Sequence, residues 1–136
     1  MTTGPLTVTD LVVEFIHDGY AIRPLDGLSF GAQSGELIVL LGPSGCGKTT
    51  LLKIIGGLIP ATSGEVWVNG KPVSGPGADR AFVFQDFALM PWATIERNVA
   101  FGLELRGVPK EERYAVARKY IKEVGLEGFE SNYPHQ

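Results

Sequence analysis

The sequence contains a single cysteine, Cys46, among its 136 residues. One thiol cannot form an internal disulfide, which excludes a small disulfide-stabilised secreted domain. The first residues, MTTGP, lack the charged start and apolar stretch of a secretion signal, so we expect a cytoplasmic location. Long apolar runs are also absent, because residues 37–41 end at Gly42 and Pro43, far short of the roughly 18 residues that a bilayer-spanning helix needs.

The sequence also has no excess of positive charge. Lys and Arg number 12 against 15 Asp and Glu, and the formal net charge is −3. No run of basic residues could follow a phosphate backbone, so we expect no nucleic acid partner. Glycine, by contrast, is abundant: 18 residues of 136 are about twice the usual ~7%. Such an excess indicates turns and close backbone approaches that other residues do not allow.

Apolar periodicity predicts an α/β fold class. Residues 6–16 and 28–30 are typical of antiparallel strands, and residues 64–73 predict a hairpin with an Asn-Gly turn. Two continuous apolar runs, at 36–41 and 80–84, predict strands buried on both faces of a parallel sheet. Helices are predicted from about Lys48, after a cap at Thr94, and from Pro109 to a glycine stop at Gly125. We therefore expect residues 1–86 to hold the sheets, and residues 87–136 to begin a helical subdomain.

Residues 42–49 (GPSGCGKT) match the pattern G-x-x-x-x-G-K-[ST] between a predicted strand and a predicted helix. In this pattern backbone N–H groups turn toward phosphate oxygens, and the helix N-terminus adds positive charge. The charge of Lys48 can reach the β- and γ-phosphates, and the Thr49 hydroxyl is an oxygen ligand of the kind that Mg²⁺ prefers. The pattern alone leaves kinases, GTPases and transport ATPases open. The predicted nucleotide ligands are Gly42, Pro43, Ser44, Gly45, Cys46, Gly47, Lys48, Thr49 and Thr50.

Four segments, in this order, resemble the nucleotide-binding subunit of ABC transporters: LDGLSF at 25–30, GPSGCGKTTLL at 42–52, PATSGEV at 60–66 and VFQD at 83–86. Residues 84–92 and 98–103 are similar to the branch that serves nitrate, sulfonate and taurine importers. The resemblance covers almost the whole chain. It implies a P-loop NTPase core with an N-terminal antiparallel β subdomain and the start of a helical subdomain.

The resemblance also implies a function and partners. ATP, bound with Mg²⁺, would power solute transport, and the full-length protein would hydrolyse it. The expected partners are a transmembrane permease subunit and a second nucleotide-binding subunit in a dimer. The expected place is peripheral, on the cytoplasmic face of the cell membrane.

Two further site residues follow from the resemblance. Gln85 is expected to contact Mg²⁺ and the attacking water, so that Gln85 and Lys48 are the catalytic candidates and Thr49 and Gln85 the metal ligands. Phe15 is expected to stack on the adenine, with Tyr20 as the substitute. The competing interpretation places Phe15 in the core, on one strand face with its neighbours at 11 and 13.

An apolar cluster in the second part of the chain has two interpretations. Met90, Pro91 and Trp92 fall where the family's helical subdomain meets the permease. A cluster of this kind can equally cover the local core. At this point both interpretations remain open.

The sequence stops before the family's Leu-Ser-Gly-Gly signature, acidic strand and switch histidine. We therefore expect this chain alone to bind nucleotide weakly and to hydrolyse almost none. We also expect uncovered apolar faces where the parallel sheet lacks neighbours. A nucleotide-binding module without turnover and a different P-loop enzyme, such as a small-molecule kinase, remain alternatives.

Overall fold

A computed structural model describes residues 5–86 and 88–136. The chain divides into two compact units, residues 1–83 and 84–136, which are described separately. Phe87, part of a segment that carries the resemblance, lies outside the described residues. Within the described ranges, no helix combines the length and the apolar character needed to cross a lipid bilayer.

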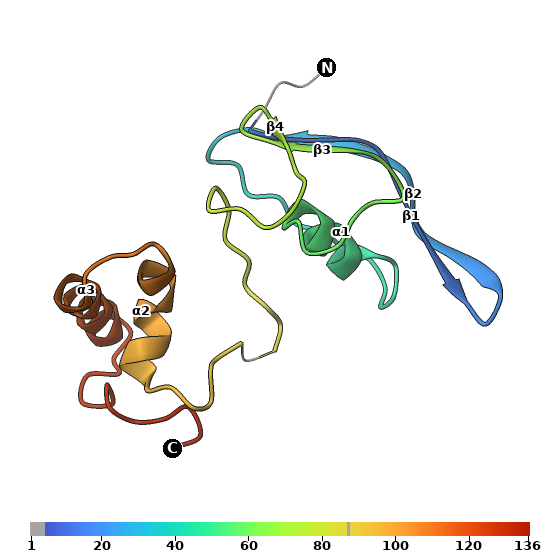
Figure 1. Cartoon of the computed structure of the whole chain (residues 1–136). Helices are drawn as coiled ribbons and strands as arrows, with labels where there is room; N and C mark the ends of the chain where they lie inside the picture. Colours follow the sequence, from blue (N-terminus) through green and yellow to red (C-terminus); the bar gives the residue numbers. More distant parts are fainter. Residues whose placement is uncertain (1–4, 87) are drawn as a thin grey trace. The chain divides into compact units, whose positions relative to one another are not determined.

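The first unit contains an antiparallel sheet of four strands in the order β2-β1-β3-β4 (Figure 1). A turn at Asp18 and Gly19 joins the two long strands, and an Asn69-Gly70 turn joins the two short ones. Asn69 and Gly70 have φ of 50° and 75°, the values that a tight hairpin turn requires, so the predicted hairpin is confirmed. The strands are β1 (Leu6–His17), β2 (Tyr20–Ala32), β3 (Ser63–Val68) and β4 (Lys71–Pro72).

Helix α1 (Lys48–Ile55) packs on this sheet through Leu51 and Ile54, which are almost completely buried. The two side chains join a core cluster with five residues of the strands: Val8, Leu11, Val13, Leu25 and Val66. The helix starts at Lys48 as the sequence predicts. Apolar residues at 51, 52, 54, 55 and 58 predict burial around most of the circumference, with a stop at Gly56 and Gly57. The stop is confirmed, but the wide burial is wrong, because Leu52 is half exposed.

Both ends of α1 approach neighbouring backbone closely, and glycine permits each contact. A Cβ atom at Gly47, the N-cap, would lie 2.8 Å from the carbonyl oxygen of Pro24 in β2. Beyond the other end, a Cβ atom at Gly57 would lie 2.1 Å from the carbonyl oxygen of Gly75. Neither space accepts a side chain.

The runs at 36–41 and 80–84 do not form sheet strands in the described part of the chain. Leu37, Leu41 and Val83 are 86%, 89% and 93% exposed. A strand with apolar side chains on both faces needs a covering layer on each side, and the described residues provide none over these three side chains. The prediction of paired parallel strands is therefore wrong for this structure, while the uncovered apolar surface is observed as expected.

The second unit pairs helix α2 (Ile95–Leu105) with helix α3 (Lys110–Glu123). The Oγ1 atom of Thr94 accepts a hydrogen bond from the Arg97 N–H at 3.3 Å, which confirms the predicted cap of α2. Ala100, Ala117 and Ile121 are buried where the helices meet. Pro109 precedes α3 and Gly125 follows its end, also as the sequence predicts.

The segment after α3 returns to the start of α2. The N–H groups of Ile95 and Glu96 donate to the carbonyl oxygens of Asn132 and Glu130 at 2.8 and 3.0 Å. These groups belong to the first turn of α2 and have no acceptor within the helix. The C-terminal segment therefore completes the cap of α2.

Candidate functional site

The loop of residues 42–47 leads into α1 and takes its shape from glycine. Gly47 has φ 95° and ψ 0°, a left-handed backbone conformation that is strained for residues with a side chain. It is buried against β2. Gly45 also has a positive φ of 81°. Ser44, Gly45 and Cys46 are exposed. The loop therefore curls over the start of α1 with its outer residues open to solvent.

The side chain of Lys48 folds back into this loop. Its Nζ atom donates hydrogen bonds to the carbonyl oxygens of Gly42 at 2.8 Å and Pro43 at 2.6 Å. The Sγ atom of Cys46 lies 3.5 Å from the same nitrogen. The ammonium charge therefore lies within the curl of the loop, beside the N-terminal end of α1.

Several backbone donors at this place are available to a ligand. Among the described residues, the N–H groups of Gly45, Gly47, Lys48 and Thr49 have no hydrogen-bond acceptor. The first turn of α1 carries no acidic residue that would repel an anion. Donors at a helix N-terminus attract anions, and the Lys48 charge adds to this attraction. These residues fit the phosphate chain of a nucleotide.

The two predicted metal ligands lie in different units and are both exposed. Thr49 stands on the first turn of α1, and Gln85 stands in a bend at the start of the second unit. Their hydroxyl and amide oxygens suit Mg²⁺. In the described part of the chain, no three His, Cys, Asp or Glu side chains are grouped to hold a metal ion. Mg²⁺ commonly takes further oxygen ligands from phosphates, so the exposed Thr49 hydroxyl of the first unit fits the part of one protein ligand.

Phe15 lies near the end of β1, opposite Ile22 of β2. Its side chain is 47% exposed, whereas Leu11 and Val13 are buried. The interpretation that Phe15 shares their core position is therefore wrong. Tyr20, beside the hairpin turn, is 76% exposed. Both aromatic rings therefore expose surface on which a base can stack.

An ion pair lies beside these aromatic residues. The Nε atom of Arg23 in β2 donates to the Oε2 atom of Glu14 in β1. This hydrogen bond, with the carboxylate charge, raises the pKa of the Arg23 guanidinium above its ordinary value. Arg23 therefore keeps a positive charge at this end of the hairpin.

The structure also separates the two interpretations of the Met-Pro-Trp cluster. Met90 is half-buried, while Pro91 is exposed and Trp92 is 73% exposed. Trp92 therefore does not cover the local core.

The sequence reasoning missed Asn98, whose side chain makes four hydrogen bonds to residues 90–94. Its spacing of four residues from the capping Thr94 was the available signal.

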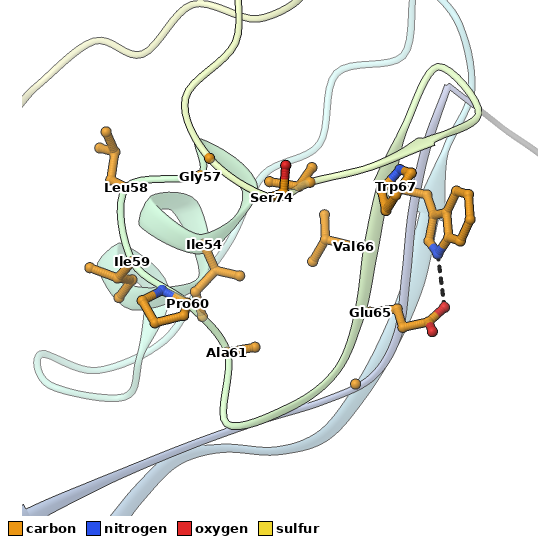
Figure 2. Close-up of a pocket in the computed structure, with 14 residues that line it drawn as sticks. Ile54, Gly57, Leu58, Ile59, Pro60, Ala61, Glu65, Val66, Trp67 and Ser74 are labelled. Carbon is orange, nitrogen blue, oxygen red and sulfur yellow. Dashed lines mark hydrogen bonds between the residues drawn. The ribbon is translucent and has the colours of Figure 1, made fainter.

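A cavity of about 380 Å³ lies between the end of α1 and β3 (Figure 2). Its lining includes no residue of the 42–47 loop, which is called the phosphate loop below. Ile54, Ile59 and Val66 contribute apolar lining, and the Trp67 Nε1–H donates to Glu65 Oε2 at 2.8 Å at its edge. None of the predicted site residues is among those that line it. The cavity lining offers no cation to a phosphate, whereas the loop of residues 42–47 has the Lys48 ammonium group beside it.

A curled phosphate loop with an enclosed lysine, placed before a helix that packs on a sheet, defines a nucleotide-binding domain of the P-loop class. The family model described as "ABC transporter" matches residues 25–136. The chain belongs to the ABC transporter family.

Individual relatives agree with this result. The chain is 53% identical over 131 residues to an uncharacterized ABC transporter ATP-binding protein of Methanocaldococcus jannaschii, covering 96% of the chain and 49% of that protein. It is 46% identical over 124 residues to the taurine import ATP-binding protein TauB of Escherichia coli K12, and the match covers 90% of the chain and 49% of that protein. The chain thus spans about half the length of these curated relatives.

Solved structures show the same fold. The dimeric ATP-binding cassette MJ0796 bound to ADP and Pi matches with a TM-score of 0.84 at 29% identity, over 96% of this chain and 62% of that one. A second dimeric structure of MJ0796, described as a bacterial ABC transporter cassette, matches with a TM-score of 0.85 at the same identity and coverage. The expected fold class is therefore confirmed, including its antiparallel β subdomain and its helices.

Proposed function

We propose that this chain binds ATP through residues 42–50 and forms part of a subunit that powers solute transport. The observation that carries the proposal is the position of the Lys48 ammonium group, 2.8 and 2.6 Å from two carbonyl oxygens of the loop. A lysine held there stands beside backbone donors that have no acceptor in the described residues. Together they supply the charge and hydrogen bonds that a triphosphate requires.

The remaining site residues take roles consistent with their exposure. Thr49 and Gln85 would provide oxygen ligands to Mg²⁺, which would offset phosphate charge when bound. Lys48 would neutralise charge that builds up on the transferred phosphoryl group, and Gln85 would orient the attacking water. Phe15, or Tyr20 in its place, would stack on the adenine.

The proposed partners are a transmembrane permease subunit and a second nucleotide-binding subunit. One relative is described as an import ATP-binding protein, and one solved relative is a dimer. Both descriptions support an assembly at the cytoplasmic face of a membrane. Because the chain spans about half of its curated relatives, we propose hydrolysis for the assembled full-length subunit and expect little turnover from these 136 residues alone.

The decisive experiment measures ATP affinity by calorimetry for the chain and for Lys48→Ala, with and without Mg²⁺. We expect Lys48→Ala to weaken binding at least tenfold, or about 1.4 kcal/mol, because the variant removes a charge-assisted contact. Lys53→Ala is the matched control, since Lys53 is an exposed lysine in the last turn of the same helix. Equal affinity of the wild type and Lys48→Ala would refute the proposed site.

Membership of the ABC transporter family disfavours the alternative that this chain is a small-molecule kinase. The choice between a transporting subunit and a binding module without turnover rests on phosphate release by the full-length protein. Steady release would support the transporting subunit, and its absence would support the binding module.

A further inference from the structure

The side chain of Arg80 closes the loop of residues 75–80 on itself. Its Nη2 atom donates a hydrogen bond to the carbonyl oxygen of Gly75, and its Nη1 atom donates to the Oδ2 atom of Asp79 at 2.9 Å. Only 17% of the Arg80 side chain is exposed. Its Nε atom is buried without an acceptor among the described residues, which is unfavourable. The two Nη contacts therefore hold this side chain in place.

The carbonyl group that Arg80 holds also contacts the end of α1. A Cβ atom at Gly57 would lie 2.1 Å from this same Gly75 oxygen, so the two backbones pack directly against each other. Gly57 has φ 73° and belongs to the turn that ends the helix. Figure 2 shows it beside the chain that carries Ser74, the residue before Gly75. Arg80 thus acts on the carbonyl group against which the helix ends.

A second contact of the same segment lies one residue earlier in the sequence. A Cβ atom at Gly56, the C-cap of α1, would lie 2.9 Å from the Cδ2 atom of Phe82. Residues 75–82 therefore pack against the end of α1 at two neighbouring glycines. Leu51 and Ile54 bury the face of α1 that meets the sheet, whereas these two contacts fix its C-terminal end.

Helix α1 joins this end to the candidate nucleotide site. It runs for 8 residues from Lys48, so at roughly 1.5 Å per residue it is about 12 Å long. Rigid secondary elements carry a displacement from one end to the other, so a change in the tilt of the last turn also moves the first turn. Hydrogen bonds weaken steeply as distance and angle depart from their optimum. The position of the last turn therefore affects how well Lys48 and the N–H groups of the first turn meet a triphosphate.

We propose that Arg80 is a positioning residue for the nucleotide site. By holding the Gly75 carbonyl group against Gly57, it fixes the C-terminal end of α1 and, through the helix, the phosphate loop. The inference rests on the proposed function, which supplies ATP as the ligand. Arg80 acts through backbone contacts and does not itself touch the nucleotide.

The first test measures amide hydrogen exchange at the end of α1. The Leu58 N–H donates to the Lys53 carbonyl oxygen at 2.8 Å in the turn that ends the helix. We expect Arg80→Ala to accelerate exchange of the Leu58 amide about tenfold. The Asn69 N–H, which donates to the Pro5 carbonyl oxygen at 2.8 Å in the same unit, is the control and should not change. Unchanged exchange at Leu58, or equal acceleration at Asn69, would overturn the proposal.

The second test measures ATP affinity by calorimetry. We expect Arg80→Ala to weaken binding at least fivefold, or about 1 kcal/mol. Arg80→Lys should stay within about twofold of the wild type, because lysine keeps a charged donor for the Gly75 carbonyl oxygen. This rescue separates a positioning contact from a general need for arginine at this place. Affinity of Arg80→Ala equal to the wild type, or an equal loss in Arg80→Lys, would overturn the proposal.

A control is needed for charge, since Arg80→Ala also removes a positive charge that attracts ATP. Lys71→Ala removes the same charge from β4, where Lys71 is exposed. We expect this variant to change ATP affinity less than twofold, because an exposed charge is screened by salt. A loss in Lys71→Ala as large as that in Arg80→Ala would assign the effect to net charge and overturn the proposal.

A second substitution covers the case in which Arg80→Ala does not fold. Arg80→Gln keeps a neutral N–H donor, so thermal unfolding should show a folded chain, with ATP affinity reduced about threefold. Wild-type affinity together with wild-type Leu58 exchange in a folded Arg80→Gln chain would overturn the proposal.

Failure of this inference and failure of the proposed function give different results. Absence of ATP binding by the wild-type chain would refute the proposed function, and with it this role of Arg80. ATP binding by the wild-type chain that survives Arg80→Ala unchanged would overturn the inference about Arg80 alone.

Discussion

Gly47 packs so closely against Pro24 that a Cβ atom on the glycine would lie 2.8 Å from the proline carbonyl oxygen. The contact joins the phosphate loop to the backbone of β2. Gly47 also has φ 95°, which L side chains rarely adopt. The shape of the loop therefore depends on Pro24, a residue of β2 far from Gly47 in the sequence.

Gly47→Ala should damage both the loop and the fold. The added methyl group must displace either α1 or β2, so we expect a lower melting temperature and at least a tenfold loss of ATP affinity. Gly102→Ala in α2 is the control, because its Cβ atom would meet no atom within 4 Å and alanine favours a helix. Calorimetry and thermal unfolding provide the two readouts. Wild-type values for Gly47→Ala in both would contradict the prediction.

Modification of Cys46 should block the nucleotide site. Its Sγ atom is 3.5 Å from the Lys48 Nζ atom, so a bulky thiol adduct would occupy space needed by phosphate. We expect chain labelled completely with N-ethylmaleimide to lose ATP binding. Cys46→Ser treated with the same reagent should retain binding, which excludes damage elsewhere. Undiminished affinity of the labelled chain would disprove this interpretation.

Phe15 and Tyr20 can be separated by comparing two ligands. Stacking on a base contributes about 1–3 kcal/mol, so loss of the stacking ring should weaken ATP binding roughly five- to 150-fold. Binding of inorganic tripolyphosphate, which has no base, should remain unchanged. We expect Phe15→Ala to show this pattern and Tyr20→Ala to resemble the wild type. The reverse result would assign the role to Tyr20.

Acid should loosen the segment that caps α2. Backbone N–H groups of Glu130 itself and of Gly128 hydrogen-bond to the Glu130 carboxylate and lower its pKa, with a smaller effect from Arg118. The stabilisation is complete above the ordinary pKa near 4.5 and is lost as the pH falls through the lowered value in the folded chain. NMR titration of the carboxyl group and exchange of the Glu96 amide should show this loss. Glu130→Gln should remove the pH dependence, and an identical profile in that variant would contradict the assignment.

The exposed apolar run at 37–41 should cause association. Leu37 and Leu41 are 86% and 89% exposed, and such side chains adhere to one another in water. We expect light scattering to show aggregation that rises with protein concentration. A double variant, Leu37→Lys with Leu41→Lys, should reduce it. A wild-type chain that stays monodisperse at high concentration would show the prediction to be wrong.

Local signals in the sequence were sufficient for the Asn69-Gly70 hairpin, the starts of the helices and the loop before α1, whereas β2 begins at Tyr20, well before the predicted 28–30. The Asn69-Gly70 turn, the Thr94 cap and the Gly125 stop each depend on residues within a few positions of one another. The runs at 36–41 and 80–84 failed as strands because their pairing depends on layers elsewhere in the fold, which periodicity cannot supply. Asn98 was missed for a related reason, since its spacing from Thr94 indicates one neighbouring carbonyl group but not its contacts with Met90 and Ala93. The contact between Gly47 and Pro24 likewise becomes visible only in three dimensions.

The two glycine contacts of α1 bring backbone against backbone near both ends of the helix. At one end Gly47 abuts β2, and just beyond the other Gly57 abuts Gly75, a loop residue that follows β4. A side chain at either glycine would force the helix away from its neighbour. Glycine, usually associated with flexibility, here permits close packing.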